Sequence, residues 1–270
     1  MTHSAHNSTA SQDPTPVTGQ AHIDALRSSV ARLHDLAATL TEQQLTGGAY
    51  PTEWTVAQVL SHLGSAAVIT QRRLEDALAG QETPDDFAPS VWDTWNAKSP
   101  VAQRDDVLAA DAELLARLQA VGPEERDRFR FAMGPMSLGF GQFVGLRLNE
   151  HAFHTWDVEV VADPAATIPA RVAALVVDNL ELIARFTGKP TGDTTTLGVT
   201  TTDPTRSFTI HLTPDRVTFT PVAQAATVDL VLPAEAFARL VYGRLDAAHT
   251  PVGVKAEAAL RTLRQVFPGP

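Results

Sequence analysis

The chain is organised around residues 146–161, which read L-R-L-N-E-H-A-F-H-T-W-D-V-E-V-V. In a helix, Glu150 and His154 lie on the same face one turn apart, with Cβ atoms roughly 5–6 Å apart. Asp157 continues that face one turn later, and Trp156 lies on the apolar side. A carboxylate and an imidazole at this spacing suit two ligands of one metal ion.

A second stretch supplies a further ligand. Residues 54–64 read W-T-V-A-Q-V-L-S-H-L-G, in which Thr55 followed by Gln58 predicts a capping box at the start of a helix. His62 lies within that helix, close to the apolar stripe that contains Val59. Three nitrogen or oxygen ligands from two helices leave a fourth position open, which is typical of a catalytic zinc rather than a structural one.

Composition excludes several classes of protein. The 270 residues suffice for one large domain or two ordinary ones, and they include no cysteine. Disulfides, thiolate metal sites and a cysteine nucleophile are therefore excluded, so any thiol chemistry must use an imported thiol. The formal net charge of −10 argues against a nucleic-acid partner, because such binding normally rests on a basic surface.

The sequence also lacks the features of a membrane protein. No apolar run is long enough to cross a bilayer, and the first residues lack the basic and apolar regions of a signal peptide. We therefore expect a cytoplasmic protein, monomeric or homodimeric, that acts on small molecules and has no membrane partner.

The first part of the chain predicts a bundle of helices. Residues 1–18 are polar and read as a disordered tail, and residues 19–166 form the first domain. Helices are expected over about 20–40, from Thr55 onward, over about 101–121, and from Met133-Gly134-Pro135 to Asp163-Pro164, with a loop at 80–100. Four helices with one long crossover predict an all-α four-helix bundle that can host a metal ion between facing helices.

The second part, residues 167–270, predicts a smaller α+β domain. A helix over 169–186 is followed by Thr- and Val-rich runs that alternate with period two, which predicts an antiparallel meander. The expected strands are 194–202, 207–213, 216–221 and 227–232, followed by a helix over 233–244, a final strand over 252–255 and a closing helix over 257–267. Helices first and strands afterwards favour two domains.

Together these stretches resemble the mycothiol-dependent maleylpyruvate isomerase family. The matching motifs are W-T-V-A-Q-V-L-S-H-L at 54–63, E-H-A-F-H-T-W-D at 150–157 and L-V-Y-G-R at 240–244, and the resemblance covers roughly residues 20 to 268. It implies a DinB-like four-helix bundle followed by a sterol-carrier-like α+β domain.

The resemblance also implies a site and a reaction. A divalent metal, usually zinc, would be held by His62, Glu150 and His154, with mycothiol as the thiol cofactor and Arg244 as a catalytic residue that points toward the active site. The expected reaction is addition of the thiolate to the cis double bond of maleylpyruvate, rotation and elimination, with Arg244 holding a carboxylate or the developing enolate. Substrate choice is expected to depend on loops such as 80–100 and 122–137.

The residues taken alone leave alternatives open. His62 alone would be a histidine hydrogen-bonded inside the bundle, and Glu150 with His154 a surface pair worth about 0.2–0.5 kcal/mol. Arg244 alone would be a cation that interacts with the carbonyls at a helix C-terminus. Asp157 either orients a ligand imidazole or only pairs with an arginine or caps backbone groups.

Further alternatives concern His151 and the chain as a whole. His151 is turned about 100° around the helix from Glu150 and is expected to be a bystander. A mycothiol S-transferase acting on another electrophile would use the same addition and omit the elimination. The alternatives from other classes are a non-catalytic protein that binds a small molecule or lipid, and a scaffold with a structural zinc.

Overall fold

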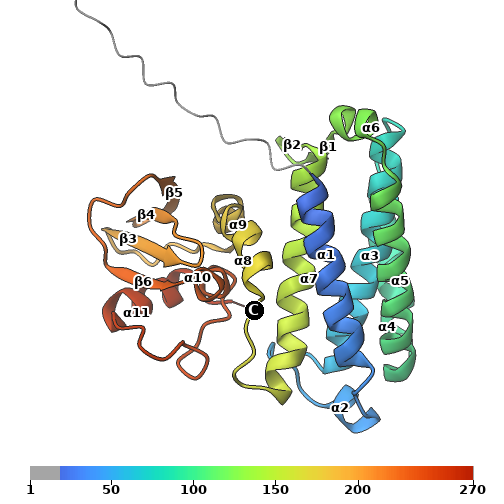
Figure 1. Ribbon diagram of the computed structural model, residues 1–270, viewed down its shortest axis with the longest axis horizontal. Coiled ribbons are helices and arrows are strands. Elements are labelled where there is room, and N and C mark those ends of the chain that lie inside the picture. The colour runs from blue at the N-terminus through green and yellow to red at the C-terminus, as the bar shows by residue number, and fades with distance from the viewer. Residues whose placement is uncertain (1–18, 270) are drawn as a thin grey trace, which may run out of the picture.

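The structure is a computed structural model that describes residues 19–269, and the tail expected at 1–18 lies outside the described residues. Within 19–269 there are eleven helices and six strands. The helices of the first part lie on one side of the molecule and a four-stranded sheet with its own helices lies on the other (Figure 1). None of the helices over residues 19–269 is long and apolar enough to cross a membrane.

Four long helices run side by side in the first part of the chain (Figure 1). They are α1 (Gly19–Ala37), α3 (Val56–Leu78), α5 (Pro100–Ala120) and α7 (Phe140–Ala162). Helix α3 packs against α5 and α7, and α1 packs against α5 and α7. Leu33, Leu60, Leu118 and Leu148 are fully buried between them, as expected for amphipathic helices around one core. The expected long helices are confirmed, with starts and ends shifted by a few residues.

The helical part is more elaborate than four helices and their loops. Three short helices occupy the connections: α2 (Glu42–Thr46), α4 (Phe87–Asn96) and α6 (Pro123–Arg128). The expectation of a loop over 80–100 is therefore wrong at α4. Prolines at 84 and 89 suggested a loop, but proline is tolerated in the first turn of a helix.

Helix α4 is fixed by one close contact. The ring of Trp95 is buried and lies directly over Gly64 of α3, where a Cβ atom would be 2.1 Å from the ring. Only glycine at position 64 therefore permits this approach.

A short hairpin that the sequence reasoning did not anticipate leads into α7. It pairs β1 (Phe131–Met133) with β2 (Met136–Leu138) in antiparallel register. Its turn contains Gly134, whose φ of +56° lies in the left-handed region that favours glycine. Helix α7 then ends at Ala162, where Asp163-Pro164 was expected to stop it.

The helix expected over 169–186 is instead two helices, α8 (Ala170–Val177) and α9 (Leu180–Thr187). The chain leaves helical geometry at Asn179, where φ is −103° and ψ is 0°. The break lets the two halves face different neighbours, because α8 packs against α1, α7 and α10 whereas α9 packs against β5 and α10.

The sheet is mixed rather than wholly antiparallel. Its strands β3 (Thr195–Thr202), β4 (Ser207–Thr213), β5 (Arg216–Val222) and β6 (Leu230–Pro233) lie in the order β5-β4-β3-β6. The first three form the predicted antiparallel meander, but β6 runs parallel to β3. The connection after β5 crosses to the far edge of the sheet, where the carbonyl of Thr227 approaches Gly198 too closely for any side chain.

Helices α10 (Ala234–Val241) and α11 (Glu257–Val266) complete the second part. The ring of Phe237 on α10 contacts the rings of Phe208 and Phe219 on the sheet, which joins helix and sheet in one core. The expectation of a strand over 252–255 is wrong, because these residues pair with no strand and Val252 is fully exposed. The expected domain boundary at 166/167 stays a prediction.

Candidate metal centre

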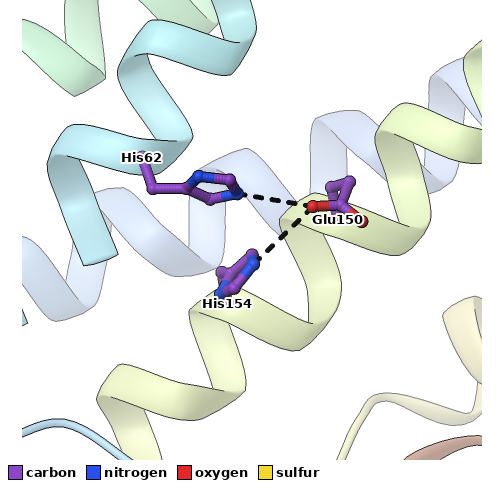
Figure 2. Close-up of side chains that lie close together, drawn as sticks. All are labelled: His62, Glu150 and His154. Atoms are coloured by element: carbon purple, nitrogen blue, oxygen red, sulfur yellow. Dashed lines mark hydrogen bonds and ion pairs between the residues drawn. The ribbon is translucent and has the colours of Figure 1, made fainter. Parts of the chain in front are cut away.

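His62 of α3 meets Glu150 and His154 of α7 (Figure 2). One ligand atom from each of the three lies within 4.8 Å of the others. Nε2 of His62 is 3.4 Å from Oε2 of Glu150, and Nε2 of His154 is 3.6 Å from the same oxygen. Over residues 19–269 this is the one group of three such side chains with ligand spacing. The structure thus brings together residues that are 88 positions apart in the sequence.

The spacing fits a shared cation better than direct hydrogen bonds. Charge-assisted N–H···O bonds are about 2.7–2.9 Å long, shorter than both separations. Two ligands bound at about 2.0–2.1 Å to a tetrahedral ion lie about 3.4 Å apart. Two imidazole nitrogens and one carboxylate oxygen are also a donor set that zinc uses in catalytic sites.

Local structure sets the position of each donor. Both halves of the predicted capping box are present, because the backbone N–H of Thr55 donates to Gln58 Oε1 and that of Gln58 donates to Thr55 Oγ1. This fixes the start of α3, and His62 follows two turns later on the side that faces α7. The ring centroid of Trp54, the first residue of the 54–64 stretch, lies 5.2 Å from that of His62 and 6.0 Å from that of His154.

The three donors differ in exposure, and two of them, His62 and Glu150, line cavities. The side chain of His154 is 12% exposed, that of His62 30% and that of Glu150 47%. A cavity of about 450 Å³ is lined by His62, Glu150 and mostly apolar residues; they include Trp92, Phe131 and Met133 from the segments expected to govern substrate choice. A second cavity of about 330 Å³ shares Glu150 and Tyr242 with the first and adds Lys189, Arg244 and Phe186.

Charge around the centre favours the protonation states that a metal ion needs at His62 and Glu150. Burial lowers the pKa of His62, which keeps its imidazole neutral. Burial opposes ionisation of Glu150, but the imidazoles of His154 and His62 beside it outweigh that effect and hold the pKa of this carboxyl well below its usual range. At neutral pH the site therefore offers an ionised carboxylate and a neutral imidazole. At His154, burial lowers the pKa, but the hydrogen bond with Asp157 and the carboxylate of Glu150 outweigh it and raise the pKa, so a metal ion must displace a proton from this imidazole.

Asp157 holds the remaining imidazole. Nδ1 of His154 lies 2.9 Å from Oδ2 of Asp157, which can only accept a hydrogen bond when ionised, so Nδ1 carries the proton. The other ring nitrogen, Nε2, faces Glu150 and would bind a metal ion once it carries no proton. Asp157 is fully buried; burial raises its pKa, but the hydrogen bond from His154 and the charge of Arg244 outweigh that effect and lower it.

Comparison with known proteins places these residues in a family. Residues 26–159 match a family model described as the mycothiol maleylpyruvate isomerase N-terminal domain. The helical part of this chain belongs to that family. All three candidate ligands lie inside the matched residues, whereas Arg244 lies outside them. No curated protein matches the chain in sequence.

Two solved structures share the fold over most of the chain. One is a crystal structure of the mycothiol-dependent maleylpyruvate isomerase, with a TM-score of 0.62, 13% identity, and coverage of 84% of this chain and 89% of that chain. The other is a histidine-to-alanine mutant of that enzyme, with the same TM-score and coverage and 12% identity. The family model thus covers most of the helical part in sequence, and the likeness in fold covers 84% of the chain.

Arg244, expected to face the active site, lines the smaller cavity but is already engaged. Its Nε and Nη2 donate to the two oxygens of Asp157, and its Nη1 donates to the carbonyl of Tyr242 at 2.9 Å. Tyr242 is the residue that ends α10, so the interaction with a helix C-terminus is present as well. A direct contact of Arg244 with substrate stays a prediction.

His151 lies outside the candidate metal centre, in a buried polar network that the sequence reasoning missed. Its Nε2 donates to Asp111 at 3.0 Å, and its Nδ1 accepts from the hydroxyl of Ser29 at 2.8 Å. Nη2 of Arg147 donates to the other oxygen of Asp111 at 2.6 Å. Ser29 and Asp111 lie 122 and 40 residues away from His151, so no local pattern in the sequence predicts these contacts.

Proposed function

We propose that this chain is a metal-dependent enzyme that uses mycothiol, or a related low-molecular-weight thiol, on a small electrophile, with cis-trans isomerisation of maleylpyruvate as the leading reaction. The observation that carries the proposal is the convergence of His62, Glu150 and His154 at ligand spacing beside two cavities. The matched family model and the fold of the isomerase structures support the choice of thiol and reaction.

The donors of this chain would hold the cation through Nε2 of His62, Oε2 of Glu150 and Nε2 of His154. A divalent cation, zinc in the first instance, supplies positive charge that favours the thiolate over the thiol. Since the chain has no cysteine, the sulfur must come from a small molecule. With three protein donors, a tetrahedral site keeps one position for an incoming group.

The surrounding residues provide space and exclude water. The larger cavity has apolar walls, which include Ile69, Phe143 and Leu146, and Trp54 covers the imidazoles from another side. Each cavity is of the size that binds a small organic molecule, a few hundred Å³. Because both open onto Glu150, a thiol and an electrophile can approach the centre at the same time.

The chemistry that this arrangement suits is reversible addition of a thiol. The sulfur electron pair forms a C–S bond to one alkene carbon, and the π electrons move onto the neighbouring carbonyl oxygen. The former carbon–carbon double bond is now a single bond, and the two carbons rotate about it. The electrons then return from the oxygen to restore the double bond in the trans form, and the C–S bond breaks, which regenerates the thiolate. Nothing is oxidised or reduced. Lys189 lines the smaller cavity beside Arg244, whose guanidinium is bound to Asp157, and the positive charge of Lys189 favours an anionic electrophile there.

The test uses the full chain, purified without added metal. We expect about one zinc per chain and conversion of maleylpyruvate to its trans isomer only when mycothiol is present. Chelation should remove both the metal and the activity, and zinc should restore them. A protein that binds no divalent metal, or that isomerises maleylpyruvate equally well without thiol, would overturn the proposal. Consumption of the thiol into an adduct without isomer would identify an S-transferase instead.

A further inference from the structure

We infer that Arg244 is a positioning residue for the metal ligand His154, acting through Asp157, so that the sheet-bearing part of the chain sets the metal affinity of the helical part. The inference rests on the proposed function in one respect only: a cation must bind at His62, Glu150 and His154.

The three side chains form a continuous line of hydrogen bonds. Arg244 Nε donates to Asp157 Oδ1 at 2.8 Å and Nη2 donates to Oδ2 at 2.7 Å, which is the two-pronged geometry that fixes a carboxylate plane. The same Oδ2 accepts from Nδ1 of His154 at 2.9 Å. Asp157 is 0% exposed and the Arg244 side chain 7%, so water does not compete for these bonds.

Each link has a physical role for the metal ligand. The carboxylate of Asp157 holds the proton of His154 on Nδ1, which leaves the lone pair of Nε2 for a cation. A buried carboxylate is costly unless a cation neutralises it, and Arg244 supplies that cation. Without Arg244, nothing would fix the plane of the Asp157 carboxylate, and the orientation of His154 would lose its support.

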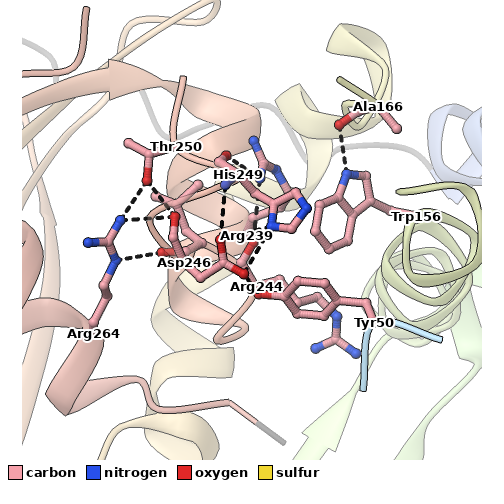
Figure 3. A network of polar contacts seen from close by, with 10 residues as sticks. Tyr50, Trp156, Ala166, Arg239, Arg244, Asp246, His249, Thr250 and Arg264 are labelled. Atoms are coloured by element: carbon pink, nitrogen blue, oxygen red, sulfur yellow. Dashed lines mark hydrogen bonds and ion pairs between the residues drawn. The ribbon is translucent and has the colours of Figure 1, made fainter. Parts of the chain in front are cut away.

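Arg244 is itself held in place by the second part of the chain (Figure 3). Its backbone N–H donates to the carbonyl of Arg239 at 2.6 Å, and the guanidinium of Arg239 is bound to Glu235 and to the carbonyl of His249. Asp246 accepts hydrogen bonds from His249, and the hydroxyl of Tyr50 donates to it from the helical part at 3.2 Å. The backbone of Arg244 is thus held by α10 and the loop after it, and its guanidinium also donates through Nη1 to the carbonyl of Tyr242.

The rival explanation is that Arg244 acts by contact with the substrate. That explanation predicts a change in KM for an anionic electrophile and an unchanged affinity of the substrate-free protein for zinc. A positioning role predicts that replacing Arg244 weakens the affinity of the substrate-free protein for zinc. The two are therefore separated by a measurement made without any substrate.

The experiment compares the zinc affinity of the substrate-free wild-type chain with that of Arg244→Lys, Arg244→Gln, Asp157→Asn and the double variant Asp157→Asn/Arg244→Gln. Competition with a chromophoric chelator gives the affinity, and the absorption spectrum of the cobalt-loaded protein reports ligand geometry. Arg206→Lys is the matched control, because Arg206 makes the same Nε and Nη2 contacts to Asp178 away from the centre.

We expect both Arg244 variants to bind zinc about 10–100-fold more weakly than the wild type, the range typical of groups that support a metal ligand. The cobalt spectrum should change, and the control should match the wild type. The double variant should bind zinc no more weakly than Asp157→Asn alone, because Arg244 acts only through that carboxylate. Lysine retains the positive charge of arginine but lacks its two-pronged guanidinium. Arg244→Lys therefore tests the hydrogen-bond geometry even if Arg244→Gln folds poorly.

Wild-type zinc affinity in both Arg244 variants would overturn the inference, and a raised KM in the same proteins would assign Arg244 to the substrate. Additive losses in the double variant would also overturn it. If the wild-type chain itself binds no zinc, the proposed function fails together with this inference. If the wild type binds zinc and the Arg244 variants bind it equally well, this inference fails but the proposed function stands.

Discussion

Oε2 of Glu150 lies 3.4 Å from Nε2 of His62, a side chain that comes from another helix 88 residues earlier in the chain. This separation is too long for a strong ionic hydrogen bond and close to the distance between two ligands of one tetrahedral ion. It depends on the packing of α3 against α7, so the candidate metal centre is a property of the helical core and not of one segment.

Replacement of a single donor should remove the metal ion. We expect His154→Ala to bind no zinc and to lose turnover, because two remaining protein ligands hold zinc poorly. The helical circular dichroism should be that of the wild type. His211→Ala, which removes an exposed histidine of the sheet, is the control and should retain both metal and activity. Zinc retained by His154→Ala at full occupancy, measured by elemental analysis, would remove His154 from the site.

The two tryptophans of α4 should respond differently to alanine. Trp92 is 47% exposed and lines the larger cavity, so Trp92→Ala should raise KM by about tenfold, the effect of 1.4 kcal/mol of lost contact. Its stability should stay within about 0.5 kcal/mol of the wild type. Trp95 is buried against α3, so Trp95→Ala should lower the free energy of unfolding by about 3–5 kcal/mol. Steady-state kinetics measure KM, and urea titration measures the free energy of unfolding. An unchanged KM in Trp92→Ala would show that this side chain does not contribute to substrate binding.

Gly64 should tolerate no side chain. An added Cβ would lie 2.1 Å from the ring of Trp95, so Gly64→Ala should destabilise the chain by about 1–3 kcal/mol, as overpacking does. Gly48→Ala is the matched control, since nothing lies within 4 Å of its Cβ position. The free energies of unfolding in urea should differ accordingly. Equal values for the two variants would show that α4 moves away from α3 without cost.

Buried His22 should make the chain less stable in mild acid. Burial lowers the pKa of His22, and the charge of Asp178 opposes this only in part. Between the lowered pKa and the ordinary value of about 6.5, the unfolded chain binds a proton that the folded chain does not. The free energy of unfolding therefore falls as pH falls through this window. His22→Gln should show a shallower dependence in chelated samples titrated with urea from pH 7 to pH 5, and an identical slope would contradict the assignment.

Local patterns in the sequence sufficed for much of the helical part. The capping box of Thr55 and Gln58, the four-residue spacing of Glu150 and His154 and the stop at Asp163-Pro164 are all encoded within one or two turns, and each is present in the structure. The spacing of apolar residues at three and four positions, which predicted the long helices, is also a pattern within a short stretch of sequence.

The features that escaped prediction depend on contacts between distant segments. Helix α4 packs through Trp95 on Gly64 of α3, and the chain that leads to β6 crosses close to Gly198 of β3. The partners of Asp157 were left open because Arg244 lies 87 residues away. The network of His151 with Ser29 and Asp111 joins three helices that only the folded chain brings together.

The position of Trp54 gives the candidate metal centre an optical reporter of its own. Its indole stacks on the ring of His154 at 6.0 Å and lies 5.2 Å from that of His62. A paramagnetic ion such as cobalt, bound between those imidazoles, would quench emission from an indole so close, whereas diamagnetic zinc would not do so by this route. Titration with the two ions should therefore reveal occupancy from the intrinsic fluorescence of the unlabelled protein, and Trp54→Phe should abolish most of the difference.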